Sequence, residues 1–195
     1  MMIKQRIIII ALSEMLDKGI EHITIKKMAQ KTGLNEDRLN DFFLFGDKEL
    51  LMDVIEYAGE KWVHEIKASI HKVPNKDQKL NTLIYGYTMG SKKYPQSLST
   101  YIDLWKLIKD KQDEYIKMRL KTIYNFYIAE FTHIVQDMGY QHIPYNALIA
   151  FGIFLTLISD VVHIQSLILD NKLDYDYMYR ILNKLTKQFL IGEIV

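Results

Sequence analysis

The chain has 195 residues, of which 49% are hydrophobic and 25% are charged, and its formal net charge is +1. This apolar content is enough to bury a substantial core, so the composition excludes a disordered protein. Because cysteine is absent, disulfides, thiolate metal clusters and cysteine nucleophiles are excluded as well, and we expect a protein of the reducing cytoplasm. The near-zero net charge provides no global attraction for nucleic acid, so any such binding must depend on local contacts.

Three prolines and nine glycines, with apolar residues recurring at helical spacing, predict an all-α protein. The first helix is expected over residues 2–18, with Gly19 as its C-terminal stop. Residues 7–10 are four isoleucines that favour a strand by propensity, but the apolar residues after them continue at helical spacing. Further helices are expected over residues 47–72, 76–92, 96–109, 111–138, 145–170 and 174–191.

Residues 24–51 form the most informative segment. Thr24 can cap a short helix that ends in a tight turn at Gly33, Asn35 can cap a second short helix, and Asp47 can cap a long one. The residues that the two short helices are expected to bury are Ile25, Met28, Ala29, Leu39 and Phe43. This is a helix-turn-helix pattern, which is typical of DNA-reading modules.

This segment resembles the N-terminal region of the TetR family of bacterial transcriptional repressors. The resemblance covers roughly residues 3–52 and is carried by Thr24, Met28-Ala29, Thr32-Gly33, Leu34-Asn35 and Leu39. It implies a three-helix, helix-turn-helix DNA-binding domain at residues 1–50. Residues 51–195 are then expected to form a larger helical domain that binds an effector and dimerises.

Two features depart from the family pattern. Asn40 stands where the family usually has tyrosine, and the interval from Phe43 to Lys48 is two residues longer than usual. Counting forward from Gly33 makes Phe43 the family's aromatic residue, whereas counting back from Lys48 makes it Phe45. Both assignments are open on the sequence alone.

The second short helix carries side chains suited to reading bases. Arg38 can donate two hydrogen bonds to guanine, Asn40 can pair with adenine, and Glu36 can accept from cytosine. Neighbouring lysines, the Thr24 hydroxyl and helix N-termini can hold phosphates. The candidate DNA-binding residues are therefore Thr24, Lys26, Lys27, Asn35, Glu36, Arg38, Asn40 and Lys48. The expected partner is a palindromic operator in double-stranded DNA.

The charge of this module is balanced. Residues 1–50 contain eight Lys or Arg and eight Asp or Glu, so their formal charge is zero. We therefore expect modest DNA affinity with a shallow salt dependence. The alternative is a helical, dimeric protein that binds a small ligand or a partner and has weak or lost operator recognition.

The apolar helix near the C-terminus predicts a homodimer. Residues 147–159 contain no charge, and this stretch is shorter than the roughly twenty apolar residues that span a membrane. We expect a buried helix and no membrane association. Since one small domain cannot cover it on every side, helices 145–170 and 174–191 are expected to form a four-helix dimer interface. The two DNA-binding domains of the dimer, called the reading heads below, would then lie one DNA turn apart, roughly 34–36 Å.

Aromatic side chains are abundant in the larger domain and suggest a pocket for a small hydrophobic or aromatic effector. The candidate ligand-binding residues are Trp62, Tyr85, Tyr101, Trp105, Tyr124, Tyr127, Phe151 and Phe154. Binding there would tilt the helix at 47–72 and change the spacing of the reading heads. We expect no enzymatic activity, cofactor or metal, because Glu60/His64 and Asp160/His163 do not make up a bundle di-metal site.

Overall fold

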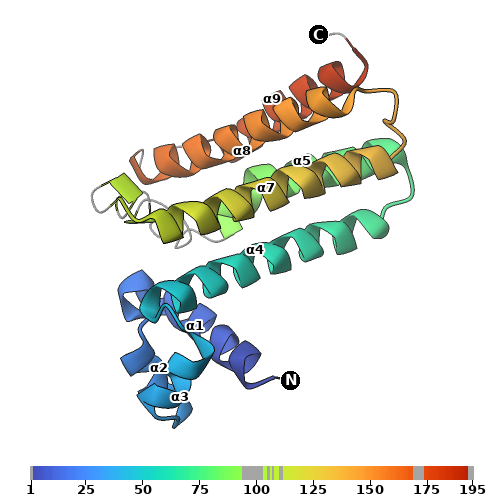
Figure 1. Ribbon diagram of the computed structural model, residues 1–195. Coiled ribbons are helices and arrows are strands. Elements are labelled where there is room, and N and C mark those ends of the chain that lie inside the picture. Colours follow the sequence, from blue (N-terminus) through green and yellow to red (C-terminus); the bar gives the residue numbers. More distant parts are fainter. Residues whose placement is uncertain are drawn as a thin grey trace. The chain divides into compact units, whose positions relative to one another are not determined.

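The computed structural model describes residues 2–93, 103–104, 106, 108–109, 112–168 and 174–192. These residues form helices and turns with no strand among them, which confirms the all-α prediction (Figure 1). The elements are α1 (Ile3–Lys18), the 3-10 helix η1 (Ile20–His22), α2 (Ile25–Thr32), α3 (Glu36–Phe42), α4 (Asp47–His71), α5 (Lys76–Lys93), α7 (Glu114–Asp137), α8 (Tyr145–Ile168) and α9 (Tyr175–Leu190). Of the helix expected at 96–109, the described residues 103–104, 106 and 108–109 are helical.

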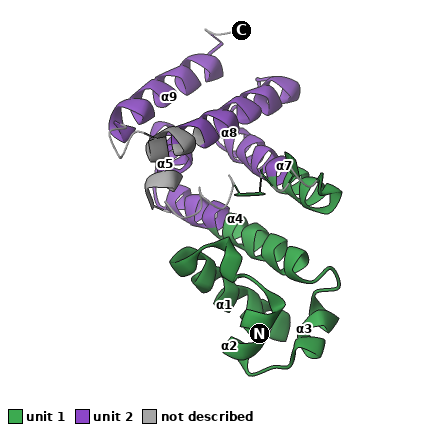
Figure 2. Cartoon of the chain, turned by 90° about the vertical axis from the view of Figure 1, so that its left-hand side faces the viewer, with its two compact units in different colours: residues 1–61, 96–123 green, residues 62–95, 124–195 purple. Residues whose placement is uncertain are grey.

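The chain forms two compact units (Figure 2). Unit 1 comprises Met1–Lys61 and Gln96–Ile123, and unit 2 comprises Trp62–Pro95 and Tyr124–Val195. Helices α4 and α7 therefore each contribute residues to both units. The predicted DNA-binding domain, residues 1–50, is part of unit 1, which also contains the first turns of α7; a functional boundary at residue 50 stays a prediction.

The isoleucine run in α1 is helical because one face of the helix is buried. Ile7, Ala11 and Met15 follow one another at intervals of four residues and are at most 4% exposed, whereas Ile9 is exposed. Burial of this stripe outweighs the strand propensity of β-branched residues. Gly19 ends the helix as predicted: its φ is 92°, and its N–H donates to the Met15 carbonyl at 2.9 Å.

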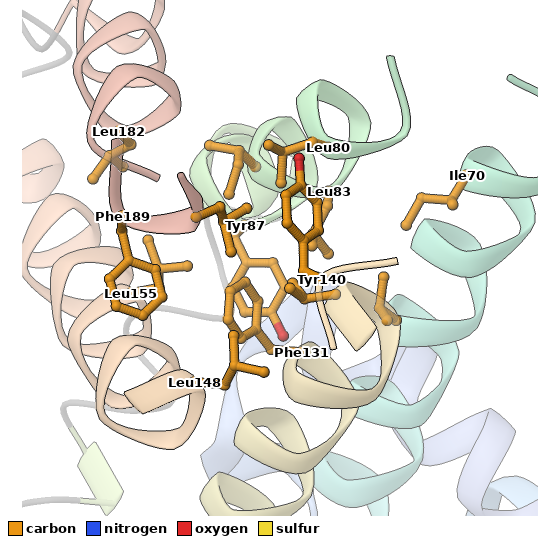
Figure 3. Close-up of a cluster of buried hydrophobic side chains, with 14 of the residues drawn as sticks. Ile70, Leu80, Leu83, Tyr87, Phe131, Tyr140, Leu148, Leu155, Leu182 and Phe189 are labelled. Atoms are coloured by element: carbon orange, nitrogen blue, oxygen red, sulfur yellow. The ribbon is translucent and has the colours of Figure 1, made fainter. Parts of the chain in front are cut away.

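The core of unit 2 is built mainly from α5, α7, α8 and α9 (Figure 3). Phe131 is completely buried, and the Tyr87 hydroxyl donates to the Tyr127 carbonyl at 3.1 Å. Phe151 stacks on Phe189 with ring centroids 4.2 Å apart. These contacts provide both apolar burial and specific ring geometry, which fix the helices of this unit against one another.

Helix α8 is buried on one side only within this single chain, and its burial in a dimer stays a prediction. Among its exposed apolar residues, Ile153, Phe154, Leu157 and Val161 are 41–58% exposed. The 18 residues Tyr145–Val162 have a mean hydropathy of 1.8, and 29% of them are buried, so by length and composition alone this helix could cross a membrane. The uncharged stretch at residues 147–159 is shorter than this 18-residue segment because it ends before Asp160. The opposite side of α8 carries Leu148 and Leu155, which belong to the core of unit 2.

Candidate nucleic-acid interface and effector site

The two short helices of the helix-turn-helix are capped as predicted. The Thr24 hydroxyl accepts from the Lys27 backbone N–H at 3.2 Å, and the Asn35 side chain accepts from the Arg38 N–H at 2.9 Å. Between them Gly33 adopts a left-handed φ of 71°, and nothing lies within 4 Å of the Cβ it lacks. Backbone conformation, not crowding, therefore calls for glycine at this turn.

Helix α3 presents most of its side chains to solvent. Leu39 is completely buried, while Glu36, Arg38 and Asn40 are exposed. A short helix anchored by one leucine leaves its polar groups free to approach a base edge, as direct readout requires. Their role in DNA binding stays a prediction.

Phe43 and Phe45, the two candidates for the family's aromatic residue, differ in their packing. Phe43 is completely buried, and its N–H donates to the Leu39 carbonyl at 3.0 Å as α3 ends. Phe45 is 64% exposed and stacks on Tyr115 of α7 with ring centroids 4.8 Å apart. Phe43 therefore holds the core position. Leu44 and Phe45 lie in the turn that leads to α4.

Two of the candidate phosphate-binding lysines already have partners within unit 1. The Lys27 ammonium donates to the Glu21 carbonyl at 3.0 Å and lies 3.1 Å from His22 Nδ1. Lys48 forms an ion pair with Asp113. Lys26 is exposed and forms no ion pair with any described residue. The positive charge without a partner in this segment is thus smaller than its lysine content suggests.

Asp113 and Arg119 are residues that the sequence analysis missed. The Lys48 ammonium holds the pKa of Asp113 below its ordinary value, aided by the Ile116 N–H, which donates to the carboxylate at 3.2 Å. Arg119 donates to Asp53 at 2.8 Å and also pairs with Glu56, and these bonds outweigh burial and raise its pKa. For Asp113 the sequence offered a single clue, because aspartate is a preferred residue immediately before a helix.

The predicted effector residues are only partly brought together in unit 2. Trp62 and Tyr127 pack edge to face with centroids 5.5 Å apart, and Phe151 lies 5.8 Å from Phe154. Tyr85 is 53% exposed. Tyr101 and Trp105 lie outside the described residues.

One polar pair in unit 2 was not anticipated. The Tyr124 hydroxyl donates to Asp160 Oδ2 at 2.8 Å. Burial raises the pKa of Asp160 to about 6, while the hydrogen bond from Tyr124 acts in the opposite direction. Unit 2 therefore combines an aromatic core with a partly desolvated carboxylate. The sequence contains little indication of this hydrogen bond, because a single aspartate in an apolar helix does not reveal which residue it contacts.

No protein-family model matches the sequence, and no curated protein matches it either. Solved structures match along nearly the whole chain. The fatty acid degradation regulator FadR from Bacillus halodurans is 13% identical with a TM-score of 0.64, over 98% of this chain and 95% of its own. FadR from Bacillus subtilis in complex with stearoyl-CoA is 13% identical with a TM-score of 0.63, over 98% and 99%. A TetR-like transcriptional regulator from Rhodococcus sp. RHA1 is 15% identical with a TM-score of 0.57, over 96% and 95%. The chain has the TetR-type fold.

The resemblance noted in the sequence is thereby confirmed at the level of the fold. At 13–15% identity the likeness defines how the backbone is arranged, so side-chain roles are argued from this chain alone. Within its TetR-type fold, the described residues contain no group of three or more His, Asp or Glu placed to hold a metal ion.

Proposed function

We propose that this protein is a ligand-responsive, DNA-binding transcriptional regulator of the cytoplasm. It binds a palindromic operator as a homodimer and is released by a small hydrophobic effector, which makes it a repressor. One observation carries the proposal: two capped helices meet at the left-handed Gly33 turn and present Arg38 and Asn40 to solvent, within a TetR-type fold.

The DNA contacts follow from the chemistry of the exposed head. Arg38, Asn40 and Glu36 read bases. The residues assigned to phosphate contact or to positioning the helix ends are Thr24, Lys26, Lys27, Asn35 and Lys48. Selection of bound duplexes from a random pool, at low and moderate salt, tests this role. We expect an enriched palindrome, and Arg38→Ala to relax the preference at one base pair while costing about 1–3 kcal/mol.

The exposed side of α8 supports a second copy of this chain as its partner. Ile153, Leu157 and Val161 recur every four residues, so they form one apolar stripe. On α9, Tyr177 and Ile181 are exposed as well. Pairing of these helices across a two-fold axis would cover both stripes.

Sedimentation without detergent tests the dimer and the absence of membrane association together. Leu157→Glu should give a monomer, because a charge would be buried in the interface. Met118→Glu is the matched control, since Met118 is 57% exposed and Leu157 58%. A native protein that is monomeric at micromolar concentration, or that requires detergent, would contradict the proposal.

The aromatic core of unit 2 supports an apolar effector. Trp62, Tyr127 and Phe151 offer ring surface for an acyl or aromatic group. The Bacillus subtilis relative was solved with stearoyl-CoA, whose long acyl chain has this chemistry. Titration of a preformed operator complex with long-chain acyl-CoA and aromatic acids should release the DNA for one of the two classes.

The second candidate function is a dimeric ligand- or partner-binding protein with weak or lost operator recognition. The zero net charge of residues 1–50 and the engagement of Lys27 and Lys48 favour it. Absence of an enriched palindrome at low salt, with a ligand still bound by unit 2, would establish this alternative.

A further inference from the structure

Lys48 lies in the first turn of α4 and is one of the residues that the proposed function assigns to phosphate contact, yet its ammonium already has a carboxylate partner. Its ammonium pairs with Asp113 Oδ2. The side chain of Asp113 is 6% exposed, whereas that of Lys48 is 55% exposed. The other oxygen of Asp113 accepts the Ile116 N–H at 3.2 Å and caps α7. Because the carboxylate is held by its own helix, the exposed lysine is the partner that can leave.

Neighbouring contacts hold the start of α7 against the beginning of α4 and the turn that precedes it. Phe45 stacks on Tyr115, and Arg119 bonds to Asp53 at 2.8 Å. The Phe45 N–H in turn donates to Glu49 at 3.1 Å. All the residues in these contacts belong to unit 1.

We propose that Asp113 is an internal competitor of DNA phosphate for Lys48. This rests on the proposed function, and it names how that DNA-binding site is restrained. A phosphate gains little from a lysine whose charge a carboxylate cancels, and the carboxylate itself repels the DNA backbone. Tight binding therefore requires Lys48 to leave Asp113. Tyr124 and Tyr127, two of the candidate effector-binding residues, also belong to α7. An effector bound at these two residues would therefore contact the helix that Asp113 caps.

The variant Asp113→Asn distinguishes the two roles of Asp113, its ion pair with Lys48 and its cap of α7. Asparagine caps helices as well as aspartate does, so α7 keeps its N-terminus while Lys48 loses its ionic partner. The matched control is Asp174→Asn. Asp174 caps α9 through the Tyr177 N–H at 2.9 Å and forms no ion pair with a described residue. Both variants change the formal net charge by the same amount.

The experiment measures binding to a duplex of random sequence and to any selected operator over a range of salt. We expect Asp113→Asn to bind both severalfold more tightly and to steepen the logarithmic salt slope by about 0.9, the contribution of one neutralised phosphate. Asp174→Asn should match the native protein. Adding Lys48→Ala to Asp113→Asn should abolish the gain.

Two results overturn the competition. One is an Asp113→Asn protein that binds the random duplex no better than Asp174→Asn does. The other is a gain that survives Lys48→Ala, since the effect would then not pass through this lysine. Failure of the proposed function gives a different pattern: no palindrome is enriched, although Asp113→Asn still strengthens binding to the random duplex.

Discussion

Asp47 accepts a hydrogen bond from the backbone N–H of Ile25 at 2.6 Å, so the first residue of α4 satisfies the first amide of α2. Amides at a helix N-terminus have no partner within the helix, and a carboxylate bonds them strongly. Thr24 satisfies a second amide, that of Lys27. The start of the helix-turn-helix is thus bound to the start of α4.

Replacing Asp47 tests this connection. We expect Asp47→Ala to lower the free energy of unfolding by about 0.5–2 kcal/mol, the usual cost of losing a helix cap. Asp47→Asn keeps an acceptor and should lose less. Asp17→Ala removes an exposed carboxylate from α1 and serves as the control. Urea denaturation measures all three, and equal stability of Asp47→Ala and Asp17→Ala would show that the bond contributes little.

The contrast between Thr24 and Asp47 shows which features the sequence could predict. Thr24 and Asn35 cap helices through amides three residues away, so their local pattern was sufficient. Asp47 was expected to cap its own helix in the same way. Its carboxylate instead bonds an amide 22 residues distant, and only the tertiary arrangement brings those groups together.

Phe43 and Phe45 provide the second prediction. Phe43→Ala removes a completely buried ring and should cost about 3–5 kcal/mol of unfolding free energy. Phe45→Ala removes one exposed stacking partner and should cost no more than about 1.5 kcal/mol. Equilibrium denaturation of the two variants gives the comparison. A larger loss at Phe45 would reverse the assignment of the core aromatic.

The effector site illustrates a second limit of sequence reasoning. Helical spacing identifies aromatic-rich faces, but it does not say which ring meets which. The selected residues Trp62 and Tyr127 are neighbours, whereas Tyr87, which contacts both, was not selected. Tyr85 was selected, yet it is exposed and pairs with Tyr179. These differences depend on the relative rotation of packed helices.

Gly86 is the subject of the third prediction. A Cβ at this position would lie 2.7 Å from both Cγ1 and Cδ1 of the buried Ile66, closer than van der Waals contact allows. Gly86→Ala should therefore destabilise unit 2 by roughly 1–3 kcal/mol, the usual cost of overpacking. In a double-mutant cycle with Ile66→Ala, the two losses should sum to more than the loss of the double variant. Strict additivity would show that the side chains adjust without strain.

The last prediction concerns Asp160, whose pKa burial raises to about 6 from an ordinary value of 3.8. A raised carboxyl pKa means that the ionised form is disfavoured in the folded protein. The cost is therefore complete above about pH 6, declines as the pH falls, and vanishes below about pH 4. It amounts to at most roughly 3 kcal/mol.

Asp160→Asn removes that charge and keeps an acceptor for Tyr124. We expect this variant to be more stable than the native protein at pH 7.5, with the difference shrinking to near zero at pH 4. Tyr124→Phe should raise the pKa of Asp160 further, because the hydroxyl stabilises the ionised carboxylate. Urea denaturation across this range measures both effects. A stability difference that does not change with pH would mean that Asp160 is solvated in the folded state.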